Sequence, residues 1–191
     1  MEKSGIRPHR LVLELSQLFN LETSLDTVLV VSMYKLNQCM DSERSSIFVF
    51  DPLNEQLTSY SSLDLAKREI RMSKSTGVAG WVFEHGMPAV INDAYDDSRF
   101  YRGVDEMTGY RTRNLICTPL IDDKGKCIGT IQSLNKKSGD FTTNDLELLD
   151  MTARLVAAAL NKKRGDDEML TIHIAGEKLG HRLSAELALS A

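Results

Sequence analysis

Apolar residues recur at helical spacing in three stretches of the chain. The first predicts an amphipathic helix over residues 8–21, with a proline in its first turn. The second predicts a helix that follows Ser24, an N-cap residue type, and continues to Cys39. The third follows Thr142 and Asp145, which have the spacing of a capping box, so we expect a long final helix there.

The apolar stripe of that final helix admits two interpretations. Such a stripe is the core-facing side of a helix within one domain, or it is a seam against a second subunit. Its members alternate at steps of three and four along the chain: Leu146, Leu149, Ala153, Val156 and Leu160.

Short apolar runs bounded by turn residues predict strands between these helices. The runs occupy residues 45–50, 57–62, 69–73, 89–92, 115–121 and 127–134. Residues 122–126 join the last two strands as a hairpin connection that contains glycine. A loop from Thr76 enters a further helix that ends at Gly86.

This order of elements predicts an α+β fold with one mostly antiparallel sheet of about six strands. We expect the terminal helices on one face of the sheet. The central helices and loops of residues 60–112 are expected on the other face, with a pocket between them and the sheet. We assign residues 1–163 to this domain and residues 164–191 to a linker or tail toward an output domain.

Composition narrows the class of protein. A chain of 191 residues with 42% apolar content is sufficient for one medium domain. A net charge of −4 without a basic block argues against a surface for nucleic acid or anionic membrane. The sequence has no apolar run near the roughly 20 residues that span a bilayer. Its three cysteines lack metal-ligand spacing, so we expect a reducing, cytoplasmic setting.

Catalytic motifs are missing from the sequence. It contains no P-loop, no nucleophile elbow and no His-Glu-x-x-His, and its four histidines are scattered. Cys117 and Cys127 fall on neighbouring predicted strands, where they are either a redox pair or two buried structural thiols. We therefore expect a protein that is not an enzyme and holds no metal or cofactor.

Two segments are candidates for binding. Residues 77–80, Gly-Val-Ala-Gly, open a helix, where free N–H groups can meet an anion or where glycine serves only the turn. If residues 99–108 form a short helix, Tyr101, Asp105 and Thr108 share one face. That face either grips a small polar molecule or is an ordinary solvated surface.

Several motifs resemble those of a GAF domain. They are Gly-Val-Ala-Gly-Trp-Val at residues 77–82, Ile-Asn-Asp-Ala-Tyr at residues 91–95, and Leu-Ile-Cys-Thr-Pro-Leu at residues 115–120. The sequence of residues 127–136 continues the match, which covers roughly residues 10–162. The chain looks most like the cyclic-nucleotide-binding GAF domains of mammalian cyclic-nucleotide phosphodiesterases and cyanobacterial adenylyl cyclases.

The resemblance implies a set of ligand contacts. The phosphate of a cyclic nucleotide would meet the backbone N–H groups of Val78 and Ala79. A strand position beside the base matches Ser46, and Tyr60 matches an aromatic residue that stacks on the purine. Ribose and phosphate would be covered by a lid whose matching residues are Tyr101, Asp105, Thr108 and Thr112.

Two positions depart from guanine-selective relatives. Ser61 stands where such a relative has Asp, and Gln132 stands where it has Glu. Because a carboxylate accepts two N–H bonds from guanine, these departures favour cAMP over cGMP. The resemblance also implies an ion pair between Lys136 and Asp145 that ties the last strand to the final helix.

We therefore expect a regulatory GAF domain that binds a cyclic mononucleotide, cAMP or cGMP, in a closed pocket. Its terminal helices are expected to pass the signal to an output domain and to form a homodimer. One alternative is a ligand-free GAF domain that serves as a dimerisation module. A remote alternative is a GAF-type methionine sulfoxide reductase that uses Cys117 and Cys127.

Overall fold

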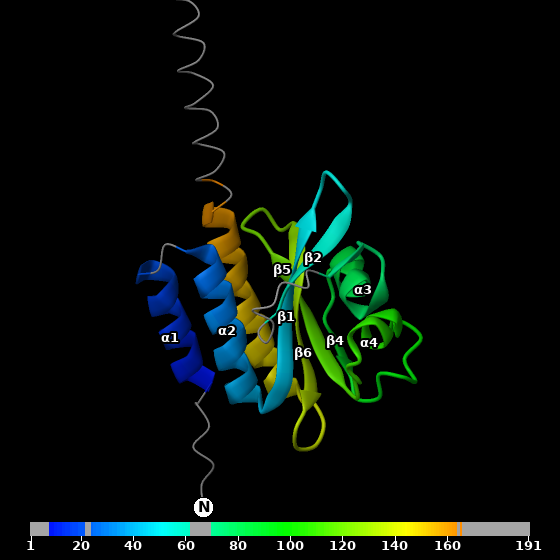
Figure 1. The fold of residues 1–191 in the computed structure, drawn as a ribbon. Coiled ribbons are helices and arrows are strands. Elements are labelled where there is room, and N and C mark those ends of the chain that lie inside the picture. The colour runs from blue at the N-terminus through cyan, green and yellow to red at the C-terminus, as the bar shows by residue number, and fades with distance from the viewer. Residues whose placement is uncertain (1–7, 22–23, 62–69, 164, 166–191) are drawn as a thin grey trace, which may run out of the picture.

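The computed structural model describes residues 8–21, 24–61, 70–163 and 165 (Figure 1). A final helix covers residues 143–163. The tail expected over residues 164–191 lies, but for residue 165, outside the described residues. The other elements, in chain order, are α1 (Pro8–Leu21), α2 (Leu25–Met40), β1 (Ser42–Asp51), β2 (Gln56–Ser61), β3 (Arg71–Ser73), α3 (Gly77–His85), β4 (Ala89–Ile91), α4 (Gly103–Thr108), β5 (Leu115–Ile121) and β6 (Cys127–Lys136).

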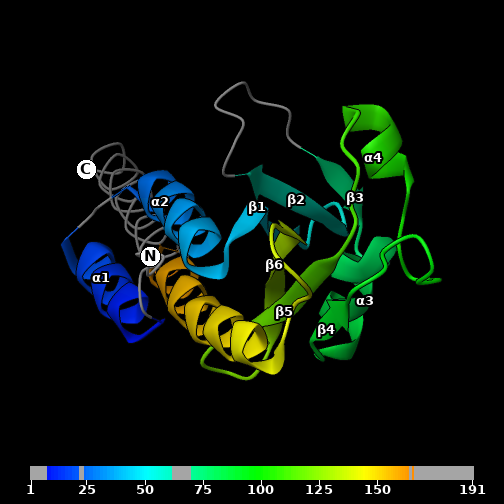
Figure 2. The same cartoon turned by 90° about the horizontal axis from the view of Figure 1, so that it is seen from below.

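The strands form one sheet of six in the order β3-β2-β1-β6-β5-β4. Each neighbouring pair runs antiparallel. Figures 1 and 2 show α1, α2 and the final helix on one face of the sheet, and α3 and α4 on the other. The α+β fold expected from the sequence is confirmed, including the placement of its helices.

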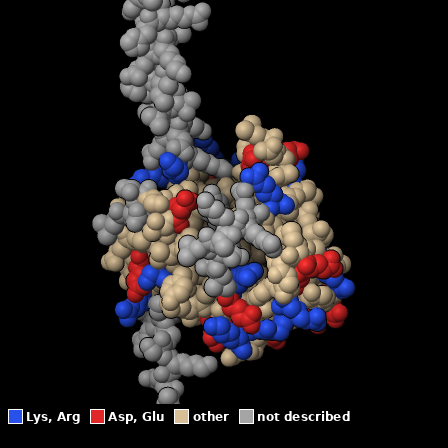
Figure 3. All heavy atoms as spheres, viewed as in Figure 1, with Lys and Arg blue, Asp and Glu red and all other residues tan. Residues whose placement is uncertain are grey.

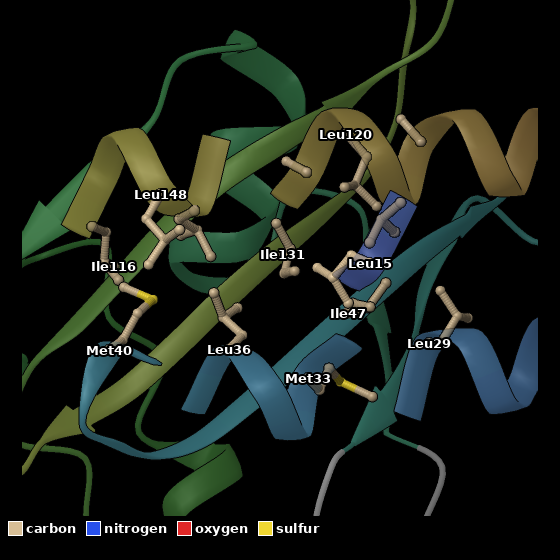
Figure 4. Packing of buried hydrophobic residues seen from close by; sticks show 14 of the residues in the cluster. Leu15, Leu29, Met33, Leu36, Met40, Ile47, Ile116, Leu120, Ile131 and Leu148 are labelled. Atoms are coloured by element: carbon tan, nitrogen blue, oxygen red, sulfur yellow. The ribbon is translucent and has the colours of Figure 1, made fainter. Parts of the chain in front are cut away.

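The main apolar core lies between the sheet and the terminal helices (Figure 4). Leu15 of α1 and Leu36 of α2 meet Ile47 and Ile131 of the sheet there, and all four are fully buried. The stripe of the final helix is therefore part of the core of one domain and not a seam between subunits. Its buried members are Leu149, Ala153, Val156 and Leu160.

Polar caps fix the start of two helices, as the sequence predicted. The Ser24 hydroxyl accepts the Thr27 N–H at 3.4 Å at the start of α2. Thr142 and Asp145 bond reciprocally, because the Thr142 N–H donates to the carboxylate at 2.8 Å and the Asp145 N–H donates to the hydroxyl at 3.4 Å. The same carboxylate accepts from the Lys136 ammonium, so β6 is tied to the final helix.

A second apolar cluster packs α3 onto the opposite face of the sheet, where β1, β4 and β5 contribute side chains. Side chains alternate along a strand, so Ile47 of β1 joins the first cluster and its neighbour Phe48 joins the second. Phe48 also borders a cavity on this face. The sheet therefore separates a filled side from a hollowed side.

Candidate functional site

The cavity lies between the sheet, the first turn of α3 and the segment that contains α4. Its volume is about 230 Å³, slightly below the roughly 300–1,000 Å³ that is typical of small-molecule pockets. A compact ligand is the natural occupant for this space. Eight of the residues assigned to the ligand from sequence line it: Ser46, Val78, Ala79, Tyr101, Asp105, Thr108, Thr112 and Gln132.

The remaining two assigned residues lie on β2. In the register of β1 and β2, Ser61 pairs with Ser46, and Tyr60 pairs with Ile47. The side chains of Tyr60 and Ser61 lie outside the described part of the molecule. Their roles in base stacking and base choice stay predictions.

The first turn of α3 forms one wall of the cavity. Gly77 has a φ of 69°, which glycine adopts without strain, and a Cβ there would lie 3.2 Å from the Cβ of Tyr101. The N-cap residue Thr76 makes no side-chain hydrogen bond to the helix. Its hydroxyl therefore leaves the N–H groups of Val78 and Ala79 uncapped, and this wall presents donors and the positive end of a helix dipole to an anion.

The segment of residues 93–112, called the lid from here on, contains α4. The sequence predicted an earlier start for this helix than Gly103, where it begins. A turn precedes it instead, because the Asp97 side chain accepts the Arg99 N–H at 2.9 Å and the Asp97 carbonyl accepts the Phe100 N–H at 3.0 Å.

Tyr101 consequently lies outside the helix. The prediction that it shares a helical face with Asp105 and Thr108 is therefore wrong. Its ring packs over Gly103, where a Cβ would come within 2.4 Å of a ring atom. All three residues of the predicted face still border the cavity. The three residues therefore reach the same cavity, although the helix is too short to include Tyr101.

Asp105 holds the lid in shape. Only 5% of it is exposed, and its carboxylate accepts the Thr112 N–H at 2.6 Å, the Thr112 hydroxyl at 2.8 Å and the Tyr95 hydroxyl at 3.1 Å. The Thr108 hydroxyl donates to the Val104 carbonyl at 2.8 Å. The polar groups assigned to the ligand from sequence thus also form the internal hydrogen bonds of the lid.

Strands β1 and β6 supply the polar floor of the cavity. Ser46 and Gln132 are direct partners across these strands, so the hydroxyl and the amide lie side by side. Arg44, two residues before Ser46, lines the same cavity and was missed from sequence. The predicted strand began at residue 45, three residues after the start of β1 at Ser42. The alternation through Ser46 and Phe48 is the signal that extends it to Arg44.

The Arg44 guanidinium rests on the ring of Tyr110, with its Cζ 4.4 Å from the ring centroid. Within the described residues its Nε is buried and has no hydrogen-bond partner. A buried donor without an acceptor costs about 1–3 kcal/mol. Because arginine carries donors only, the cavity wall here is suited to an acceptor on a ligand.

Apolar side chains complete the lining of the cavity beside these polar groups. Phe48, Met72 and Phe100 are among them. An apolar lining with a few converging polar groups is typical of a site for a small molecule with a flat or apolar part and a charged or polar part.

The described residues also bear on metal binding, membrane crossing and surface charge. They contain no group of three or more His, Cys, Asp or Glu side chains placed to hold a metal ion. None of the helices within the described ranges combines the length and the apolar content needed to cross a bilayer. On the face drawn in Figure 3, acidic and basic side chains are interspersed.

Comparison with known proteins agrees with this architecture. The sequence model of the GAF domain family matches residues 24–160. A Caenorhabditis elegans protein named "Probable 3',5'-cyclic phosphodiesterase pde-5" is 31% identical over 160 residues, which cover 76% of this chain and 22% of that protein. The "Dual 3',5'-cyclic-AMP and -GMP phosphodiesterase 11A" of Takifugu rubripes is 32% identical over 125 residues, or 59% of this chain and 14% of that protein.

Solved structures share the fold at low sequence identity. The GAF domain from a phosphoenolpyruvate-protein phosphotransferase of Coxiella burnetii superposes with a TM-score of 0.75 at 17% identity, covering 87% of this chain and 99% of that one. A free methionine-R-sulfoxide reductase from Neisseria meningitidis, solved with its substrate, gives a TM-score of 0.70 at 18% identity, covering 83% and 91%.

The fold is that of GAF domains, and it contains a cavity of a size for a compact ligand. The chain belongs to the GAF family. It spans about a fifth or less of the length of the curated phosphodiesterases that it matches.

Proposed function

We propose that this GAF domain binds a cyclic mononucleotide in the cavity and signals through its terminal helices. The observation that carries the proposal is the convergence on one cavity of an uncapped helix N-terminus, a polar strand pair and a polar lid. A cyclic nucleotide needs these three features, because it has a singly charged phosphate, a ribose and a flat base. Two relatives are named as phosphodiesterases of 3',5'-cyclic nucleotides, which supports the same ligand class.

In this proposal the phosphate accepts from the N–H groups of Val78 and Ala79 at the start of α3. The ribose and phosphate are covered by the lid, and the base lies toward Ser46 and Gln132. The amide of Gln132 both donates and accepts, which suits adenine better than a carboxylate does, so we propose cAMP as the preferred ligand. Arg44 adds a donor for an acceptor atom on the base.

The signal would leave the cavity through the lid and the sheet. Binding stabilises the closed lid, and the ion pair between Lys136 and Asp145 links β6 to the final helix. We propose that the terminal helices carry the change to an output domain in the longer protein and join two copies as a homodimer.

Reductase chemistry at Cys117 and Cys127 is disfavoured by the structure. Across β5 and β6, Cys117 pairs with Gln132 and Cys127 pairs with Ile121, so the two cysteines are not direct partners. Burial raises the pKa of both thiols, so neither is a thiolate near neutral pH. Among the described residues that line the cavity there is no cysteine. We therefore propose a binding domain and not an enzyme.

Isothermal titration calorimetry with cAMP and cGMP tests the proposal. Asp105→Ala and Thr112→Ala are each expected to raise the dissociation constant at least about tenfold, a loss of about 1.4 kcal/mol, because each removes lid bonds and a polar group from the cavity. Glu106→Ala is the matched control, because Glu106 is an exposed acidic neighbour on α4. We expect it to change the constant less than about twofold.

Thermal unfolding separates this proposal from the alternative of a ligand-free dimerisation module. A true ligand at 100 times its dissociation constant adds about 2.7 kcal/mol to the free energy of unfolding. If neither nucleotide raises the unfolding temperature while the protein elutes as a dimer, the dimerisation module is the correct description.

A further inference from the structure

Glu43, the second residue of β1, is the centre of a hydrogen-bond network at the C-terminal end of the lid. Its carboxylate accepts from the Tyr110 hydroxyl, the Arg113 guanidinium and the Asn135 amide, each at 2.9 Å. Glu43 does not itself line the cavity. Tyr110 lies near the end of the lid, Arg113 lies just before β5, and Asn135 lies in β6. One carboxylate therefore joins segments that are far apart in sequence.

Asn135 completes the anchor from the β6 side. It has a φ of 55° and lies between the Ser42–Lys136 and Arg44–Leu134 pairs of the β1–β6 ladder. In this left-handed conformation its side chain accepts the Arg113 N–H at 2.7 Å and donates to the Arg111 carbonyl at 2.8 Å. The backbone of the lid's last residues is thereby fixed to the sheet, and Tyr110 is presented to Glu43.

Tyr110 connects this anchor to the cavity. Its hydroxyl is bonded to Glu43, while its ring borders the cavity and carries the Arg44 guanidinium at 4.4 Å. A guanidinium stacked on an aromatic ring follows the position of that ring. The buried Nε of Arg44, which lacks a partner among the described residues, is therefore aimed by a side chain that Glu43 holds.

The charge of Glu43 is maintained at neutral pH. Burial acts to raise the pKa of this carboxyl, but hydrogen bonds from its three donors outweigh burial, and the pKa lies below its usual range. Burial and the bond to Glu43 raise the pKa of the Tyr110 hydroxyl, which stays protonated and keeps donating. The bond is a charge-assisted one, roughly twice as strong as a bond between neutral groups.

We propose that Glu43 is a positioning residue for the nucleotide site: through Tyr110 it fixes the donor that Arg44 presents to the base. The inference rests on the proposed function, because it assumes a ligand with acceptor atoms in the cavity. It assigns a binding role to a residue that never touches the ligand.

The test is a set of dissociation constants measured by calorimetry with cAMP and cGMP. Glu43→Gln keeps the shape of the side chain but removes its charge, and Tyr110→Phe keeps the ring but removes its hydroxyl. Each is expected to weaken binding of the preferred nucleotide about tenfold, corresponding to loss of one hydrogen bond to a charged group. Having two variants protects the test if one of them folds poorly.

A positioning role is distinguished from a structural one by coupling to Arg44. In an Arg44→Lys background, which removes the planar donor, Glu43→Gln is expected to weaken binding by less than about twofold. Glu14→Gln is the matched control, since Glu14 pairs with Lys35 at 2.6 Å on the helix side of the sheet. We expect this control to leave the dissociation constant within about twofold.

Two results would overturn the inference while leaving the proposed function intact. One is a wild-type protein that binds a nucleotide with an affinity that neither Glu43→Gln nor Tyr110→Phe changes. The other is an equal loss of affinity from Glu43→Gln with Arg44 and with lysine at that position. If the wild-type protein binds neither nucleotide, the proposed function itself fails and the inference fails with it.

Discussion

The two faces of the sheet differ in how neighbouring residues of the same strand are used. On the helix side, Ile47 and Ile131 are fully buried against the terminal helices. On the opposite side, Ser46 and Gln132, the residues next to them in sequence, border the cavity. One strand therefore contributes alternately to a close-packed core and to a polar wall.

The difference shows which face of the sheet contributes more to the free energy of unfolding. A close-packed face gains from every buried methylene, at about 0.8 kcal/mol each. The cavity face forgoes that packing and leaves the Arg44 Nε buried without a partner among the described residues. If this division is correct, substitutions on the helix face change the free energy of unfolding, and substitutions on the cavity face change affinity.

The largest effect is expected from Ile131→Ala. Ile131 is fully buried in the main core, so its truncation leaves a cavity between the sheet and the helices. Urea denaturation should show a loss of about 2–5 kcal/mol in the free energy of unfolding. Gln132→Ala, one residue further along β6, is the control and should cost less than about 1 kcal/mol. Equal losses for the two variants would contradict the division between the faces.

A smaller effect is expected where the faces are joined. Asp145→Ala removes the cap of the final helix and the partner of Lys136 together. We expect a loss of about 1–3 kcal/mol by the same urea measurement, because a cap and a partly buried ion pair are lost. Arg154→Ala breaks the exposed pair with Asp150 and should cost about 0.5 kcal/mol or less. A similar cost for both would show that the Lys136–Asp145 link adds no more than a surface pair does.

Local signals in the sequence were sufficient for most of the fold. The caps at Ser24 and Thr142 act within a few residues of their partners, so a short motif predicts them. Apolar periodicity identified the helices and strands because each has one face on a core. The start of α4 was wrong because the Asp97 turn competes locally with a helix, and no periodic signal separates the two.

The candidate site depended on a different kind of information. The resemblance to a family supplied the set of residues that line the cavity, since periodicity alone favoured a solvated surface over a ligand-binding face for the lid. The anchor at Glu43 was not predictable from either source. Glu43 and Asn135 are 92 positions apart, and their contact depends on the left-handed backbone at Asn135, which no local pattern in the sequence indicated.

The smallest effect on stability, and the sharpest on binding, is expected from Gln132→Glu. Gln132 lies on the cavity side of β6 and its side chain is partly exposed, so we expect the free energy of unfolding to change by about 0.5 kcal/mol or less. A carboxylate accepts N–H bonds from guanine but cannot donate to adenine. The ratio of cGMP to cAMP affinity should therefore rise about tenfold, measured by calorimetry with both nucleotides.

Gln132→Asn, which keeps the amide, is the control and should leave the ratio within about twofold. An unchanged ratio in the Gln132→Glu variant would place base choice elsewhere in the cavity, and a large loss of stability would show that Gln132 belongs to the packed part of the sheet.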